Sequence, residues 1–337
     1  MYKKITRVYI YAIGVIFFLI VGCEKNNSNT DKITSQLSIK DTLNIGIVSV
    51  VDHPSLDSAR FGFIETMNKF AKKNNKKIFY SYQSANLSRD KEVSVISTYI
   101  GDQDDLILTI GTSPTQTAKN LTERIPVVFA AVTNPGGDKI VNSLEKPGAN
   151  VTGASDLYPV KEQLALIKEF FPNTKKVGFI YNKGETNSVY IVELAEKYSN
   201  ELGISIVHAT AERTVDVQSA VSSIIKKIDA LVMPTDNTAA AAVLVIGNIC
   251  LENNVPFFST ELESVKKGLA IASTYSNYTN VGKEAGKIAV RIIQDETPGH
   301  IPVKFLDDFE LVLSKKLIDK YQVTPSDATV NKARIIE

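Results

Sequence analysis

Leu43-Asn44-Ile45-Gly46-Ile47-Val48 is a short, mostly aliphatic run of the kind that forms a strand buried on both faces. A helical pattern follows from about Ser55 and places Leu56, Ala59, Phe63, Met67 and Phe70 on one face. Further strand patterns at 77–82, 106–110 and 126–132 alternate with helical patterns near 88–100 and from Pro114. This alternation is typical of βαβ units and a parallel sheet.

A second block repeats the same order. It begins with Lys176-Val177-Gly178-Phe179-Ile180-Tyr181, and its remaining strands are expected at 204–209, 230–234 and 256–259. Helices are expected near 188–202, 215–227 and 239–252. This weak internal duplication predicts an α/β protein with two similar lobes, each a doubly wound parallel sheet.

The two lobes are expected to share the chain rather than follow one another. Residues 150–153 lead into the second block, residues 269–274 leave it, and a third crossing is expected near 301–313. We therefore expect an N-terminal lobe of 43–151 plus 275–300, a C-terminal lobe of 152–274, and a final crossing strand with a C-terminal segment at 301–337. The helix expected at 281–294 should pack on the first lobe. A multi-strand hinge of this kind implies closure on a ligand.

The N-terminus is typical of an exported lipoprotein. Lys3, Lys4 and Arg7 precede an apolar run over 8–21 that is too short to span a membrane. Ile20-Val21-Gly22-Cys23 follows and resembles the bacterial lipobox, which predicts a signal peptide at 1–22 and a lipid on Cys23. Residues 23–42 are mostly polar and predict a tether to a membrane of the cell envelope. The alternative is an uncleaved anchor with an incidental cysteine.

Composition excludes several classes of function. The 337 residues include 38 basic and 37 acidic side chains, so no charge-driven preference for nucleic acid is expected. Cys250 lies in an apolar stretch and is expected in the core. No catalytic motif is present, and His53, His208 and His300 are far apart, so neither catalysis, a cofactor nor a metal is expected. His53 alone follows a predicted strand closely enough to approach a ligand.

Candidate binding residues lie in the turns after the strands, where ligands bind to parallel sheets. Gly111-Thr112-Ser113-Pro114-Thr115 offers hydroxyls at a helix start, with Ser113 suited to the cap and Pro114 to the first helical position. The equivalent turn of the second block, Pro234-Thr235-Asp236-Asn237-Thr238, adds a carboxylate. A zwitterion could place its carboxylate on the first turn and its ammonium on Asp236 or Asp156. The alternative is that Ser113 and Asp236 only cap helices.

Other polar turns follow neighbouring strands in both blocks and extend this set. The predicted ligand-binding residues are Asp57, Thr112, Ser113, Thr133, Asp156, Asn187, Ser188, Thr235, Asp236, Asn237 and Glu261.

With these residues placed, the sequence resembles the ABC transporter substrate-binding proteins of the aromatic-amino-acid (tryptophan/tyrosine) type. The resemblance runs over about 43–313. It rests on VDHPSLD (51–57), IPVVFAAVTNP (125–135), KPGANVTG (146–153), SDL (155–157), YN (181–182) with NS (187–188), PTDNT (234–238) and ASTY (272–275). It implies the type I periplasmic-binding fold and a cleft ligand that is often an aromatic amino acid. Asn134 and Gly111-Thr112-Ser113 depart from the usual pattern and leave the ligand's identity open.

The function expected from these observations is that of a substrate-binding lipoprotein that delivers a small molecule to an ABC permease and its ATPase. The alternative is a sensory domain that reports its ligand to a membrane signalling protein. Enzyme and repressor functions fit less well, because no nucleophile–base pair is visible and a lipid signal replaces the DNA-binding headpiece of bilobal repressors.

Overall fold

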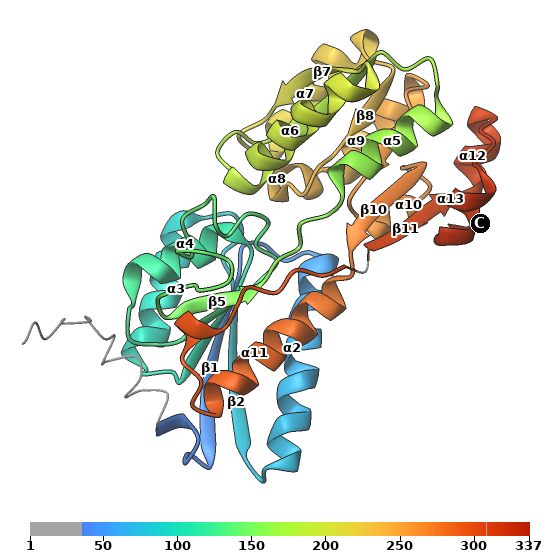
Figure 1. Ribbon diagram of the computed structural model, residues 1–337. Coiled ribbons are helices and arrows are strands. Elements are labelled where there is room, and N and C mark those ends of the chain that lie inside the picture. The colour runs from blue at the N-terminus through green and yellow to red at the C-terminus, as the bar shows by residue number, and fades with distance from the viewer. Residues whose placement is uncertain (1–35, 308) are drawn as a thin grey trace, which may run out of the picture.

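The computed structural model describes residues 36–307 and 309–337, and it forms two α/β lobes joined by several passages of the chain (Figure 1). The predicted signal peptide, Cys23 and most of the predicted tether lie outside the described residues. Within the described ranges, no helix is both long and apolar enough to cross a membrane.

The first lobe is built on a five-stranded parallel sheet. Its strand order is β2 (Lys77–Ser84), β1 (Thr42–Ser49), β3 (Leu106–Ile110), β4 (Val127–Ala130) and β5 (Val151–Ala154). Residues 45–48 of β1 are all buried. Because successive residues of a strand point to opposite faces of the sheet, this burial requires that both faces of β1 are covered.

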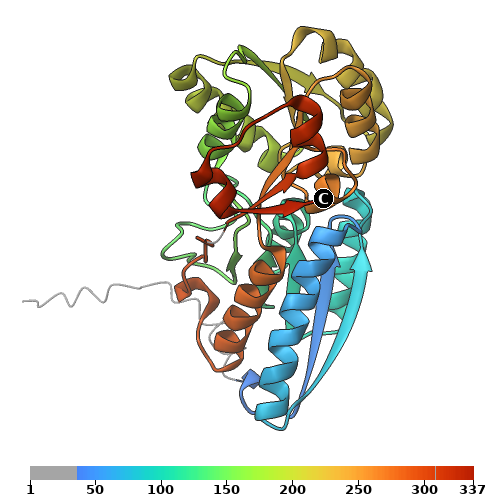
Figure 2. The same cartoon turned by 90° about the vertical axis from the view of Figure 1, so that its right-hand side faces the viewer.

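Helices cover both faces of this sheet. On one face α2 (Pro54–Lys73) lies beside α11 (Tyr278–Ile293), as both views show (Figures 1 and 2). Gly282 allows their close approach, because an added Cβ would overlap the carbonyl oxygen of Ala59. On the other face, α3 (Arg89–Gly101) and α4 (Thr112–Leu121) pack through residues such as Ile96 and Ala118. The late helix α11 therefore returns to the first lobe, as the sequence predicts.

The second lobe is built on a seven-stranded mixed sheet. Its strand order is β12 (Ala333–Ile336), β11 (Phe309–Ser314), β10 (Ala272–Ser276), β9 (Phe257–Ser259), β8 (Ala230–Val232), β6 (Lys176–Tyr181) and β7 (Ser205–Thr210). All neighbours are parallel except β10 and β11. The chain leaves the second lobe after β10 and later enters β11 from the first lobe. β11 therefore begins at the end of the sheet where β10 ends, and it runs antiparallel to β10.

Helices also flank the second sheet. α5 (Val160–Phe170), α6 (Thr186–Ser199) and α12 (Lys315–Tyr321) share one apolar cluster with β6 and β8. α7 (Val217–Ile224), α8 (Asn237–Ala240), α9 (Val243–Glu252) and α10 (Leu262–Lys266) contribute to another, which includes the buried Cys250. The remaining short helices are α13 (Asp327–Lys332) and four 3-10 turns at Asn200–Leu202, Thr214–Asp216, Ile225–Lys227 and Pro298–His300.

The chain passes between the lobes three times within the described ranges, after β5, after β10 and before β11. Ser276 ties two passages together, because its hydroxyl donates to the carbonyl oxygen of Asp156 at 2.9 Å. Lys304 pairs beside β5, donating to the Gly153 carbonyl and accepting from the Ser155 amide. Sheet pairing thus assigns residues 152–154 to the first lobe and β11 and β12 to the second.

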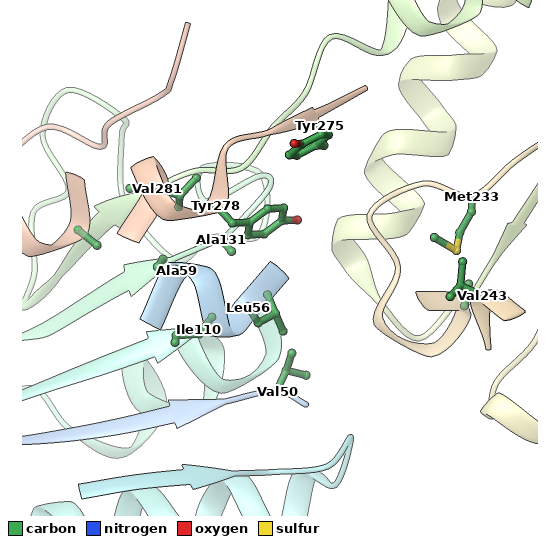
Figure 3. Packing of buried hydrophobic residues seen from close by; sticks show 14 of the residues in the cluster. Val50, Leu56, Ala59, Ile110, Ala131, Met233, Val243, Tyr275, Tyr278 and Val281 are labelled. Carbon is green, nitrogen blue, oxygen red and sulfur yellow. The ribbon is translucent and has the colours of Figure 1, made fainter. Parts of the chain in front are cut away.

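One apolar cluster extends across the junction of the lobes. It contains Val50 and Leu56 of the first lobe together with Met233 and Val243 of the second (Figure 3). Tyr278 lies at the start of α11 and points its ring toward the second lobe. The strand ends that carry the predicted binding turns therefore face each other.

Candidate ligand-binding cleft

The turns at the carboxyl ends of the strands enclose two neighbouring cavities between the lobes. The inner cavity has a volume of about 30 Å³, and the outer cavity has a volume of about 690 Å³. Thr112, Asn187 and Asn237 line both. Ala131, on the inner wall, has a φ of 59°, a left-handed conformation that is strained for a residue with a side chain. Backbone strain of this kind often occurs where a fold positions a binding site.

Three buried carboxylates dominate the inner cavity: Asp156, Asp236 and Glu261. The residues that line this cavity include no lysine or arginine, and His53 is their only potential cation. Removal from water raises the pKa of all three carboxyl groups above its usual range. The inner cavity is thus a desolvated acidic site, suited to a ligand cation. The described residues contain no group of three or more His, Cys, Asp or Glu side chains placed to hold a metal ion.

Asp156 is positioned by the passage that follows β5. Its Oδ1 accepts from the Thr133 hydroxyl at 2.9 Å, and its Oδ2 accepts from the Tyr278 hydroxyl at 3.0 Å. Burial raises the pKa of Asp156, and these two hydrogen bonds oppose that increase. Each oxygen accepts one of the two or so hydrogen bonds that a carboxylate oxygen can take, so Asp156 retains acceptor capacity toward the cavity.

Glu261 connects the two lobes. It precedes α10 in the second lobe, and its Oε2 accepts from the Ser55 hydroxyl of the first lobe at 2.5 Å. Nδ1 of His53 lies 3.7 Å from the same oxygen and also accepts from the Ser55 amide as the cap of α2. Burial raises the pKa of Glu261, while His53 lowers it. A carboxylate on this seam contacts its partners across the cleft only when the lobes are together.

Asp236 serves mainly as a structural acceptor. Its Oδ1 accepts from the Ala239 amide at 2.6 Å and so caps α8, while its Oδ2 accepts from the Asn182 amide at 2.6 Å and the Ser188 hydroxyl at 2.7 Å. Burial, with the nearby Glu185 carboxylate, raises the pKa of Asp236 to about 7. The capping alternative is therefore observed. Three donors leave Asp236 less acceptor capacity for a ligand than Asp156 has.

The turn at residues 111–115 starts its helix earlier than the sequence predicts. α4 begins at Thr112 and Gly111 is its N-cap, with a φ of 103° that suits glycine, so Ser113 is not the cap. The helix begins two residues before Pro114 because the glycine permits the sharp turn. The Thr112 hydroxyl is buried and has no hydrogen-bond partner among the described residues. Together with the N–H groups of the first turn, it offers donors to an anionic or carbonyl oxygen.

Most predicted site residues meet in the cleft. The inner cavity is lined by Thr112, Thr133, Asp156, Asn187, Thr235, Asp236, Asn237 and Glu261. Ser113 lines only the outer cavity, where its hydroxyl accepts from Arg89 at 3.1 Å. Ser188 is buried behind Asp236 and lines neither of the two cleft cavities.

Asp57 is not brought to the cleft. It lies in the first turn of α2 and pairs with Arg60 at 2.6 Å, and it lines neither cleft cavity. His53 does line the inner cavity, because it is the N-cap of this helix and its extended backbone places its side chain outside the helical array to which Asp57 belongs.

Several contributors were missed in the sequence, among them Tyr278 and Glu185. Tyr278 lines the inner cavity from a segment far along the chain, with only a predicted helix start as a signal. Glu185 lines the outer cavity and accepts from the amide and side chain of both Asn237 and Thr238. The turn that contains Glu185 was visible in the sequence, but this role was not.

The two-lobed fold and its cavity at the hinge define the class of bilobal ligand-binding proteins. Solved structures of this class include a solute-binding protein from Bacillus halodurans with bound myo-inositol, which has 15% sequence identity and a TM-score of 0.60 and covers 83% of this chain and 97% of its own. Within this class, the chain belongs to the ABC transporter substrate binding protein family, whose model matches residues 44–336.

Two further relatives show the likeness in more detail. A tyrosine-binding protein from Clostridioides difficile (strain R20291) is 35% identical over 298 residues, which are 88% of this chain and 86% of that protein. The structure of an ABC domain in complex with L-Trp from Streptococcus pneumoniae has 27% identity and a TM-score of 0.82, and it covers 87% of this chain and 100% of its own.

Proposed function

We propose that this protein is the substrate-binding lipoprotein of an ABC importer and that it captures an amino acid, with an aromatic side chain, in the interlobe cleft. The observation that carries the proposal is the inner cavity, in which buried carboxylates face a helix N-terminus and an unpartnered hydroxyl. An α-ammonium and a polar oxygen on one small ligand would satisfy both parts.

The ligand ammonium is assigned to Asp156 and Glu261. Asp156 uses one hydrogen bond on each oxygen, and Glu261 uses its Oε2 to bridge the lobes. An ammonium between them would provide the charge that offsets their desolvation. Thr112, with the first turn of α4, is assigned to an oxygen of the ligand. Asp236 completes the acidic wall and holds the turn that carries Thr235 and Asn237.

The aromatic class is supported by the relatives, since one is a tyrosine-binding protein and another was solved with L-Trp. Leu56 of the first lobe, Ala240 of the second and Tyr278 at the hinge supply apolar wall around the polar groups of the inner cavity. Such a mixture of apolar wall with a few polar contacts is usual for small-molecule sites.

The proposal includes lobe closure on the ligand. The structure matches the L-Trp complex with a TM-score of 0.82, although a ligand-free, open structure of a substrate-binding protein with adhesive properties from Clostridium difficile is more similar in sequence. That open structure is 32% identical, covers 88% of this chain and 99% of its own, and has a TM-score of 0.68. Contacts of Glu261 with Ser55 and of Asp138 with Thr186 join the lobes in this arrangement.

The transport role is proposed from the family and the N-terminus. A lipid on Cys23 would hold the lobes outside the cytoplasm at a membrane, within reach of a permease and its ATPase. The protein's task would then be binding and release, without catalysis.

A calorimetric screen tests the ligand assignment. L-Tyrosine, L-tryptophan and the other standard amino acids are titrated into the purified protein, and an aromatic amino acid is expected to bind most tightly. A ligand at 100 times its Kd should also stabilise the fold by about 2.7 kcal/mol. Binding by none of the amino acids would reject the proposed ligand class.

A further inference from the structure

We propose that the cleft accepts ligands extended beyond the carboxyl group of a single amino acid, namely short peptides that place their free amino terminus in the inner cavity. This inference rests on the proposed function, because it uses the same ammonium site. It differs in its use of the second cavity, which has more room than the rest of a single amino acid would fill.

The size of the two cavities supports an extended ligand. The inner cavity, at about 30 Å³, has room for a head group, whereas the outer cavity has about 690 Å³ and is lined by both lobes. Binding sites for ligands of drug-like size commonly enclose about 300–1,000 Å³. The two cavities meet at Thr112, so a ligand anchored inside can continue outward past this residue.

The junction offers a polar group with no protein partner. Thr112 is 4% exposed, and its hydroxyl has no hydrogen-bond partner among the described residues. An unpaired buried hydroxyl is costly unless a ligand or water meets it. In a peptide bound by its amino terminus, the first peptide group would follow the ammonium by two bonds and could meet this hydroxyl.

The charged side chains also differ between the inner and the outer cavity. Lysine and arginine are absent from the inner lining, but Arg89 of the first lobe and Arg213 of the second line the outer cavity, with side chains 50% and 73% exposed. Each also has an acidic partner, since Arg89 pairs with Glu92 at 3.3 Å and Arg213 with Asp216 at 2.9 Å. Two of the outer carboxylates are already engaged, since Glu92 accepts from Thr117 and Glu185 from Asn237. Glu212 is exposed to solvent. The ligand's carboxylate is therefore better matched by the outer cavity than by the acidic inner cavity that contains Asp156. In that position it would lie farther from the ligand ammonium than the carboxylate of a single amino acid does.

The test compares probes that differ only in the carboxyl extension. L-Tyrosine, L-tryptophan, L-tyrosyl-L-alanine and L-tryptophyl-L-alanine are titrated into the full chain purified in detergent. The dipeptide of the better amino acid is expected to bind at least as tightly as that amino acid. Arg213→Gln should weaken dipeptide binding by about fivefold, because this guanidinium is mostly exposed, and should leave amino-acid binding within twofold.

Arg124→Gln is the matched control. Arg124 precedes β4, at the end of the sheet away from the cleft, and is exposed. Its loss should leave both affinities unchanged. Amino-acid binding with dipeptides bound tenfold more weakly or not at all would overturn the inference and leave the proposed function standing. Failure of all four probes would reject both.

Discussion

Asp156→Asn isolates the charge of the inner cavity with little change of shape. Asp156 is 5% exposed and contacts Thr133 and Tyr278 through hydroxyl groups. The hydroxyl groups of Thr133 and Tyr278 can each donate to the amide oxygen or accept from the amide nitrogen of the introduced asparagine. The variant can therefore keep both hydrogen bonds. What it loses is one negative charge beside the proposed ligand ammonium.

The expected loss of affinity follows from this geometry. Removing one partner of a buried, hydrogen-bonded charge pair costs about 2–5 kcal/mol. Glu261 remains as a second acceptor, so we expect a value near the lower end, about 2 kcal/mol or roughly 30-fold in Kd. Titration calorimetry with L-tyrosine and L-tryptophan measures it.

The stability of the ligand-free protein should move the other way. Burial raises the pKa of Asp156, so the folded state favours the protonated form and loses stability as pH rises through that raised pKa. At pH 7.5, Asp156→Asn should therefore be as stable as the wild type or more stable, and the difference should shrink as pH falls. Urea unfolding at pH 7.5 and at a lower pH measures the difference.

Asp57→Asn is the matched control, since this residue pairs with Arg60 outside the cleft cavities. It should change Kd by less than twofold and cost about 0.2–1 kcal/mol of stability. A change of less than threefold in Kd for Asp156→Asn, or an equal loss in the control, would refute the assignment of Asp156 to the ammonium.

Four other outcomes are expected. Asp236→Ala removes the acceptor of three donors and the cap of α8, so urea melts should show a loss of at least about 2 kcal/mol; unchanged stability with lost affinity would instead make it a ligand contact. Ligand affinity should fall as pH drops from 8 to 5, because protonation of the acidic wall, where the pKa of Asp236 is raised to about 7, removes charge facing the ammonium; calorimetry showing a constant Kd would contradict this. Small-angle scattering should give a smaller radius of gyration once L-tyrosine or L-tryptophan saturates the cleft, and an equal radius would argue against closure. Cys23→Ser should leave the protein folded but free of membranes, and a variant that sediments with membranes without an acyl label would contradict lipid anchoring.

Local patterns were sufficient for much of the architecture. Hydrophobic periodicity, which acts over a few residues, was sufficient to predict β1, β6 and α2. The general position of the site also follows, because a parallel sheet brings the turns after its strands to one edge. Thr112 and Glu261, from different blocks, were expected in the cleft on this ground and line it.

Other features depend on contacts between distant segments. The antiparallel placement of β11 depends on where the chain re-enters the second lobe. Tyr278 joins Asp156 across more than a hundred residues of chain, which no local pattern encodes. The use of Asp236 as a cap depends on three donors from two separate segments.

The sequence by itself determined the two α/β lobes, the helix that returns to the first lobe and the turns that carry polar groups. The tertiary structure alone decided which of those groups face the cavity. Asp57 and His53 are four residues apart on either side of a predicted helix start, yet only His53 lines the cleft. The physical reason is that secondary structure follows from the spacing of neighbouring residues. The direction and remaining hydrogen-bonding capacity of a side chain are set by the packing of segments far apart in the chain.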